Sequence, residues 1–184
     1  MKTTNKTIGV YWGRFNPVHK GHMAVIKKLS KKVDRLTIAV GSAQLKNEKN
    51  NPFSGAERAR MIRAYLDEEG ITCRVVAVND QGGYYSATRN LVKKCGRFDI
   101  LFLSTEYLRA GKALSHRRIV RALAGHAHIE YFERRGRLSA TLVRDRIAHG
   151  ENWEHLTGKS VADIIRELDG IERIRKSYAT NRCD

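Results

Sequence analysis

Short apolar runs of strand length alternate with longer segments of helical periodicity along most of the chain. The strand-length runs lie at residues 7–12, 35–40, 74–78, 98–103 and 128–132. Between them, apolar residues recur every three or four positions, as Ile26, Leu29 and Val33 do. Strands that alternate with helices imply a parallel sheet with right-handed crossovers. The sequence therefore predicts an α/β fold: a doubly wound, Rossmann-like parallel sheet of about five strands.

The pattern changes after Gly136, where only helical periodicity remains. It predicts one helix from Ser139 to His149 and a second over residues 159–176, with a single apolar stripe. Earlier in the chain, Ser54 and Glu57 have the spacing of a capping box that opens a helix of about four turns. We therefore divide the chain into a Rossmann-like core (1–136), a small helical extension (137–178) and a flexible tail (179–184).

The composition is that of a globular protein with a large excess of positive charge. The 184 residues include 35 Lys and Arg against 19 Asp and Glu, a formal net charge of +16. Such a field gathers nucleotides, nucleic acid or acidic membranes, and clusters such as Lys27–Lys32 and Arg117–Arg121 contribute to it. Most of these residues are expected on solvated helix faces. RNA binding is not expected, because we find neither interleaved aromatic residues nor an RNP-like strand.

Neither a membrane span nor a secretory signal is expected, because every apolar run is short. The three cysteines, Cys73, Cys95 and Cys183, have no metal-like spacing. The simplest interpretation is a protein of the reducing cytoplasm.

The stretch from Gly13 to His22 follows the first predicted strand and opens the first helix. It contains neither a dinucleotide fingerprint nor a P-loop, but it places His19 and His22 three residues apart at the helix start. At this position in an α/β sheet, helix amides and imidazole N–H groups suit an oligophosphate. Zinc would need a further ligand, and none is apparent.

A second helix start, at residues 138–147, combines the plausible N-cap Ser139 with Thr141 and Arg144. A hydroxyl, free helix amides and an arginine together can hold phosphate. Alone, such a sequence is usually only a cap. We expect the two helix starts, more than a hundred residues apart, to fold into one cradle for the tail of a nucleoside triphosphate.

The two segments resemble the signatures of a known superfamily. His19-Lys-Gly-His22 looks like the H-x-G-H motif of the nucleotidyltransferases, and the stretch from Ser139 to Arg144 is similar to their second motif, S-x-T-x-x-R. Together with residues 41–44, 51–58 and 151–156, in this order and spacing, they resemble the archaeal-type nicotinamide-mononucleotide adenylyltransferases. The resemblance runs over nearly the whole chain.

The resemblance implies transfer of AMP from ATP to the 5′-phosphate of nicotinamide mononucleotide (NMN), giving NAD and pyrophosphate. It implies that Mg²⁺ is carried by the ATP phosphates rather than by a protein cage. By matching positions, His22 contacts the α-phosphate, His19 the neighbouring phosphates, and Arg14 the reacting phosphates. The implied catalytic residues are His22, His19, Arg14 and Arg144, and the implied ATP-binding residues are Gly13, Gly21, Ser139, Thr141 and Arg144.

The NMN-binding residues implied by the resemblance are Phe15, Asn16, Gln44 and Tyr84. Tyr84 stands where the family usually has a tryptophan that stacks on the nicotinamide ring, although Tyr84 or Tyr85 as a loop anchor is about equally compatible with the sequence. Phe15 fits a packing role equally well. Asn16 replaces the usual glutamine, and this change bears on which acceptor is used.

Other functions remain open at this stage. The acceptor could be nicotinate mononucleotide, phosphopantetheine or flavin mononucleotide, or the chain could be a basic nucleotide- or RNA-binding module without catalysis. The intact set of His19, His22 and Arg144 favours the enzyme. From the family we also expect a homo-oligomer.

Overall fold

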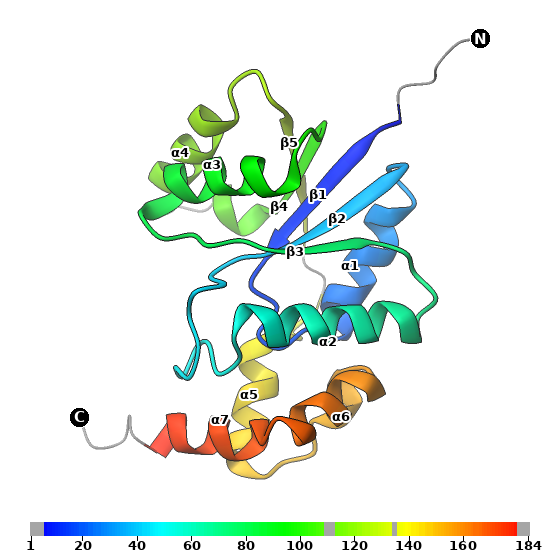
Figure 1. Cartoon of the computed structure of the whole chain (residues 1–184). Helices are drawn as coiled ribbons and strands as arrows, with labels where there is room; N and C mark the ends of the chain where they lie inside the picture. Colours follow the sequence, from blue (N-terminus) through cyan, green and yellow to red (C-terminus); the bar gives the residue numbers. More distant parts are fainter. Residues whose placement is uncertain (1–5, 109–112, 134–135, 180–184) are drawn as a thin grey trace.

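Five parallel strands form a single sheet in the order β3-β2-β1-β4-β5 (Figure 1). The strands are β1 (Ile8–Gly13), β2 (Arg35–Val40), β3 (Arg74–Ala77), β4 (Ile100–Ser104) and β5 (His128–Phe132). The computed structural model describes residues 6–108, 113–133 and 136–179. The predicted Rossmann-like class is confirmed. Arg134, Arg135 and residues 180–184 of the predicted tail lie outside the described residues.

Helices cover both faces of the sheet, and three further helices, α5 to α7, come after the last strand in the chain. The helices are α1 (Lys20–Ser30), α2 (Gly55–Glu68), α3 (Gly83–Cys95), α4 (Ala113–Leu123), α5 (Ala140–His149), α6 (Lys159–Glu167) and α7 (Gly170–Ala179). Two short 3₁₀ segments are η1 (Thr105–Leu108) and η2 (Glu154–Leu156). Among the described residues, no helix is long and apolar enough to cross a membrane.

The alternation of side chains along the central strands divides the core into two layers. Tyr11 of β1 packs with α1, α2 and the C-terminal helices, whereas Val10 and Trp12 pack with α3 and α4. In β4, Phe102 and Leu103 are likewise buried on opposite faces. Burial on both faces explains why these strands read as continuous apolar runs.

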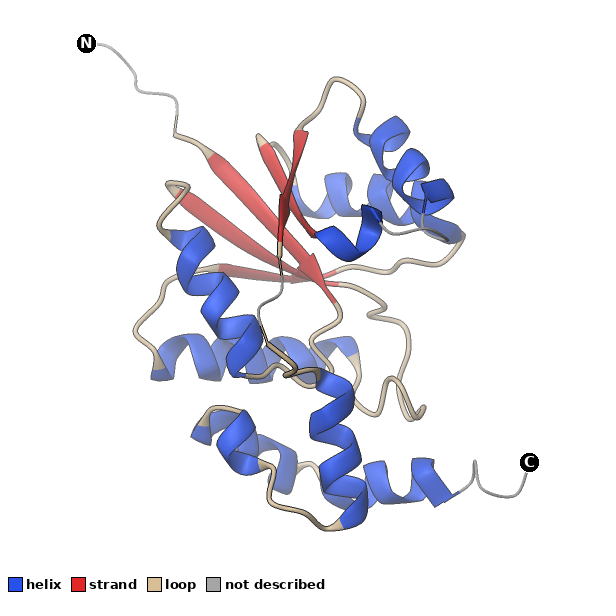
Figure 2. Cartoon of the chain, turned by 180° about the vertical axis from the view of Figure 1, so that it is seen from behind, coloured by secondary structure: helices blue, strands red, loops and turns tan. Residues whose placement is uncertain are grey.

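The C-terminal extension departs from the prediction of one helix over 159–176. The structure has two helices, α6 and α7, that meet at Asp169, whose φ of 52° is left-handed. The apolar stripe nevertheless continues, since Ile165 of α6 and Ile174 of α7 are both fully buried. In Figures 1 and 2 these helices lie below α1 and α2, and α5 connects them to the sheet.

Candidate active site

The strand order reverses at β1, because β2 and β3 lie to one side of it and β4 and β5 to the other. In open α/β sheets, ligands bind outside the carboxyl ends of the strands at such a reversal. The stretch from Arg14 to His19 leaves β1 at this point and leads directly into α1. The fold therefore places the first predicted motif at the expected binding edge.

The turn after β1 is tightly packed. Phe15 has a left-handed φ of 52°, and its ring lies so close beneath Gly13 that a Cβ there would be 2.9 Å from the ring. Phe15 is 1% exposed and packs edge-on against Tyr11. A non-glycine residue in this conformation persists only where its surroundings hold it. Glycine at position 13 is thus required by the close approach of the ring.

The two imidazole rings lie against each other at the start of α1. His19 is the N-cap of the helix, and its Nδ1 accepts a hydrogen bond of 3.1 Å from the backbone N–H of Gly21. The ring centroids of His19 and His22 are 3.7 Å apart, and Phe15 flanks His22 at 4.9 Å. Both histidines are buried, at 4% and 6% exposure. The pair is therefore oriented before any ligand arrives.

The second predicted motif reaches the same place from the far end of the chain. Ser139 is the N-cap of α5, and its hydroxyl accepts a hydrogen bond from the N–H of Leu142. Helix geometry leaves the amides of Ala140 and Thr141 without an intrahelical partner. Figures 1 and 2 both show the start of α5 beside the loops that leave β1. Leu138 would lie 3.7 Å from a Cβ on Gly21, so the two helix starts are neighbours.

Arg144 connects the two segments directly. Its guanidinium donates to the carbonyl oxygen of Asn16, 128 positions earlier, at 2.8 Å, and more weakly to Asn50 and Thr141. It is 4% exposed, and its Nε has no hydrogen-bond partner among the described residues. A buried N–H without an acceptor costs free energy unless a ligand supplies one. The two segments that the sequence analysis pairs are thus in direct contact, and we call the edge that they form the candidate phosphate cradle.

Three arginines converge on this edge. Burial lowers the pKa of Arg144 from its ordinary value, and the nearby charge of Arg14 lowers it further. Burial likewise lowers the pKa of Arg58 to about 10, again with a contribution from Arg14. Grouped like charges are costly, and a bound anion relieves that cost. The electrostatics of this edge therefore favour a polyphosphate.

A cavity of about 410 Å³ opens beside the two helix starts. It is lined by the end of β4, the residues after β4 and β5, and the segment that leads into α5: Ser104, Thr105, Glu106, Glu133, Gly136, Arg137, Leu138 and Ser139. This volume lies within the usual range for a small-molecule site. The cavity adjoins the candidate phosphate cradle on the side of β4. It offers room for the nucleoside part of a nucleotide.

The residues expected to contact the acceptor are more dispersed. Asn16 is 2% exposed, and its amide exchanges hydrogen bonds with the backbone of Phe53. Gln44, after β2, exchanges hydrogen bonds with Asp80, after β3. Tyr84, on α3, is half-buried against Tyr107. The structure therefore places these residues around the loops after β1, β2 and β3, with the side-chain amides of Asn16 and Gln44 already hydrogen-bonded.

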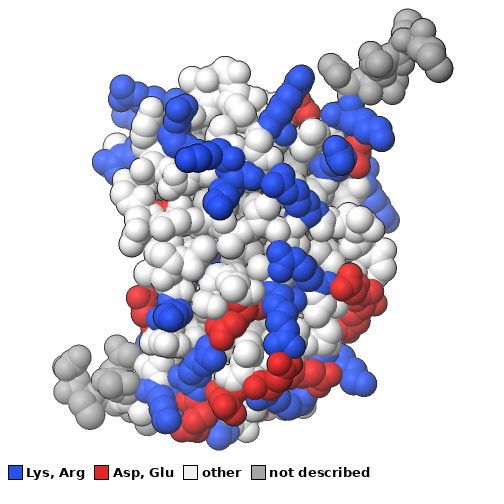
Figure 3. Space-filling model, viewed as in Figure 1, with Lys and Arg blue, Asp and Glu red and all other residues white. Residues whose placement is uncertain are grey.

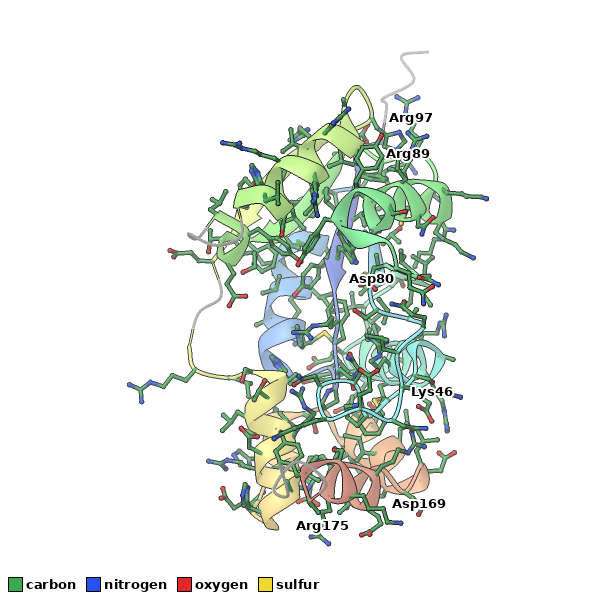
Figure 4. The ribbon with its side chains drawn as sticks, turned by 90° about the vertical axis from the view of Figure 1, so that its left-hand side faces the viewer. Lys46, Asp80, Arg89, Arg97, Asp169 and Arg175 are labelled. Atoms are coloured by element: carbon green, nitrogen blue, oxygen red, sulfur yellow. The ribbon has the colours of Figure 1, made fainter. Side chains whose placement is uncertain are left out.

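Two residues of this edge were not singled out from the sequence. Asp80 accepts from the backbone N–H and hydroxyl of Ser42, both at 2.8 Å, and so joins the loops after β2 and β3. In Figure 4, Asp80 lies between the helical layer with Arg89 and the loop with Lys46. Arg58 is fully buried beneath the turn after β1. The sequence feature that could have identified Arg58 is its position at the end of the 51–58 motif.

Comparison with known proteins agrees with this geometry. A family model described as cytidylyltransferase-like matches residues 10–146. The nicotinamide-nucleotide adenylyltransferase of Thermococcus onnurineus is 34% identical over 94% of this chain and 89% of its own length. The enzyme of the same name from Methanosarcina mazei is 34% identical over 92% of this chain and 93% of its own. The chain therefore belongs to the cytidylyltransferase-like nucleotidyltransferases and, among them, to the nicotinamide-nucleotide adenylyltransferase family.

A solved structure shares the fold. It is a bifunctional NMN adenylyltransferase/ADP-ribose pyrophosphatase from Francisella tularensis, complexed with AMP and a manganese ion. The TM-score is 0.71 at 18% sequence identity, over 97% of this chain and 53% of that protein. This chain thus spans about half the length of the bifunctional protein.

Proposed function

We propose that the protein transfers AMP from ATP to the 5′-phosphate of NMN, giving NAD and pyrophosphate. The observation that carries this proposal is the contact of Arg144 with the backbone of Asn16, which joins both phosphate-binding motifs in one site. Membership of the adenylyltransferase family supplies the acceptor. The extension, residues 137–178, completes the site because it contributes Ser139, Thr141 and Arg144.

The reaction is an in-line displacement at the α-phosphorus of ATP. An oxygen of the NMN phosphate forms the new P–O bond, and the bond to the β-phosphate oxygen breaks as pyrophosphate leaves with the electron pair. The protein supplies position and positive charge rather than a covalent intermediate. His22 donates to the α-phosphate, His19 to the neighbouring phosphates, and Arg14 to the reacting oxygens. These groups stabilise the negative charge that grows in the transition state.

The β- and γ-phosphates lie at the start of α5 in this proposal. Ser139 and the amides of Ala140 and Thr141 bind them at the positive end of the helix dipole. The Nε of Arg144, buried and without an acceptor among the described residues, donates to a phosphate oxygen. Gly13 and Gly21 contribute by leaving room for two rings of the site, since a Cβ on Gly13 would lie 2.9 Å from the Phe15 ring and one on Gly21 3.0 Å from the His19 ring. The adenosine occupies the cavity beside β4.

On the acceptor side, Tyr84 stacks on the nicotinamide ring and Gln44 lines the pocket. Phe15 and Asn16 form its floor, where they are buried. An aromatic face suits the electron-poor pyridinium. Both Gln44 and Tyr84 are half-buried, which supports a lining role.

ATP enters as its Mg²⁺ complex. No group of three or more His, Cys, Asp or Glu side chains that could hold a metal ion occurs within residues 6–108, 113–133 and 136–179. In this proposal phosphate oxygens and water carry the ion, as is common for Mg²⁺. The ion would neutralise phosphate charge and assist the departure of pyrophosphate.

We also propose that the chain self-associates in the cytoplasm and binds no nucleic acid. Tyr85, Leu108, Leu114 and Val120 are exposed apolar side chains on α3, η1 and α4. Because α4 packs on both α3 and η1, we place the proposed contact between copies on this layer. Light scattering of the purified protein measures the association, and a nucleic-acid binding assay at physiological salt tests the last point.

The test of function is a product assay. Purified protein is incubated with ATP, Mg²⁺ and, in turn, NMN, nicotinate mononucleotide, phosphopantetheine or flavin mononucleotide, and the adenylylated product is identified by mass. We expect NAD from NMN with one pyrophosphate per turnover. Turnover with flavin mononucleotide alone would reject the acceptor assignment, and no turnover with any acceptor would reject the enzyme.

A further inference from the structure

Arg58, on the first turns of α2, is a completely buried arginine whose partners are all backbone carbonyls. Its Nε donates to Phe53 at 3.0 Å and Ser54 at 3.2 Å. One terminal nitrogen donates to Arg14 at 2.6 Å and Gly41 at 2.8 Å, and the other to Ser42 at 2.7 Å. One guanidinium thus joins the turn after β1 to both ends of the long loop after β2.

The charge of Arg58 is not neutralised by a direct contact. No ion pair links it to a carboxylate of the described residues, and Asp80 and Glu57 act on it only at longer range. A buried charge without a paired carboxylate is costly. The protein nevertheless keeps this charge beneath the edge where the phosphates are proposed to bind. Only a guanidinium offers enough N–H donors for these five carbonyl contacts, so the contacts bring a third positive charge to the edge that holds Arg14 and Arg144.

The bond to the carbonyl of Arg14 acts on a strained part of the site. The next residue, Phe15, has a φ of 52°, and Asn16 is held from the other side by Arg144. The buried guanidinium groups of Arg58 and Arg144 therefore fix the turn by hydrogen bonds to the carbonyls of its residues 14 and 16. The side chain of Arg14 remains exposed. Its direction depends on a backbone that Arg58 fixes.

We propose that Arg58 is a positioning residue for adenylyl transfer: it holds the backbone of Arg14 so that the Arg14 side chain meets the reacting phosphates. The inference rests on the proposed function, which wild-type turnover in the same assay tests separately. Misplacing a catalytic group by about 1 Å typically costs about 100-fold in rate. An effect exerted through Arg14 must vanish when the Arg14 side chain is gone.

A double-mutant cycle tests this dependence. Arg58→Lys keeps the charge but cannot reach five carbonyls, and we expect kcat to fall about 100-fold while the KM for ATP changes less than about threefold. In the background of Arg14→Met, the same substitution should lower kcat by less than about threefold, because coupled residues are not additive. Circular dichroism and the midpoint of thermal unfolding confirm that each variant is folded.

Arg60→Met is the matched control, because Arg60 is exposed two residues further along α2 and pairs with Glu167. It should leave kcat unchanged. Equal losses from Arg58→Lys with and without Arg14 would overturn the proposal, as would wild-type kcat in Arg58→Lys. Should Arg58→Lys fail to fold, Arg58→Gln replaces it in the cycle. If neither folds, Arg58 is a folding residue only, and the proposal is wrong.

Discussion

The candidate site combines side chains that are oriented by local contacts with one long-range contact that joins its two segments. The His19 ring is fixed by the N–H of Gly21 and stacks on His22. Arg144 leaves α5 to bind the backbone of Asn16. Groups oriented before the substrate arrives cost little reorganisation during the reaction. The site is therefore preorganised at its phosphate end.

Replacing His22 by alanine should lower kcat about 100- to 1000-fold, because one donor to the developing charge is removed. The KM for ATP should change much less, since Arg144 and the α5 amides remain. Steady-state kinetics with ATP and NMN measure both constants. His149→Ala, on the exposed end of α5, is the control and should behave as wild type. Full activity of the His22 variant would refute its contact with the α-phosphate.

The sequence predicted the positions of several candidate site residues in the fold, because those positions depend on local signals, whereas their roles stay predictions. Helix starts can be predicted from a few neighbouring residues, and such starts contain His19, His22 and Ser139. Arg58 and Asp80 were missed, because their partners lie up to 44 positions away and are largely backbone atoms. Every residue has a backbone carbonyl, so no sequence pattern indicates which carbonyls a buried side chain will bind.

Among the secondary-structure elements, the strands and the start of α2 were predicted correctly, whereas one helix boundary was not. All five strands and the capping box of Ser54 and Glu57 are confirmed. The break between α6 and α7 was not foreseen, because the apolar stripe keeps its period across Asp169. Directly after the break the chain is tightly packed: a Cβ on Gly170 would lie 2.7 Å from the buried ring of Phe53 and 2.8 Å from the carbonyl oxygen of Ile165.

Gly170→Ala should therefore destabilise the protein by about 1–3 kcal/mol, as overpacking of a core does. Neither the ring nor the backbone oxygen can move away cheaply. Denaturant unfolding followed by circular dichroism measures the loss. Glu172→Ala, an exposed site on the same helix, is the control and should shift the free energy of unfolding by less than about 0.5 kcal/mol. If Gly170→Ala were as stable as wild type, the contact of residue 170 with the Phe53 ring would not be tight enough to exclude a methyl group.

The start of α2 is tied to α7 by an ion pair with a pH-dependent effect. Burial would raise the pKa of Glu57, but hydrogen bonds from Ser54 and Arg173 outweigh it and hold the pKa below its ordinary value of 4.5. A carboxyl whose pKa is lowered by folding adds stability above its unfolded pKa. That stability is lost as the pH falls through the folded pKa.

Glu57→Gln should consequently be less stable than wild type at pH 7, and the difference should shrink as the pH falls below about 4.5. Glutamine still offers an oxygen to the N–H of Ser54, so the comparison isolates the charge. Urea midpoints between pH 3 and pH 7 measure it. Glu151→Gln, whose contact with Arg146 is long at 3.8 Å, serves as the control. If the difference in urea midpoint between Glu57→Gln and wild type stayed constant from pH 3 to pH 7, the charge of Glu57 would not be the source of the stability.

Over the whole molecule, charge is unevenly distributed. In Figure 3, acidic side chains gather over the lower part of the face, where α2, α6 and α7 lie, and the upper part shows mostly Lys and Arg. Lower contacts such as Arg60 with Glu167 and Arg173 with Glu57 pair the two signs. Helices α3 and α4 contain no acidic residue. The α3–α4 layer therefore contributes six basic residues and no acidic one to the positive field, and α1 likewise contains no acidic residue.

A field of this kind steers anionic substrates, so kcat/KM for ATP should fall several-fold between about 50 and 500 mM salt while kcat changes little. A triple variant, Arg117→Ser with Arg118→Ser and Arg121→Ser, should show a shallower dependence. Initial rates at a series of salt concentrations test both. Parallel slopes for the two proteins would show that the α4 charges do not guide substrate.

The late position of Ser139 and Arg144 has a consequence for biosynthesis. A ribosome that has released the first 136 residues has completed every strand, yet the nascent chain lacks the groups at the start of α5. Domains generally fold from the N-terminus during translation. A nascent chain of this length therefore lacks the phosphate-binding groups proposed for α5, and the complete site can form only after that helix has emerged.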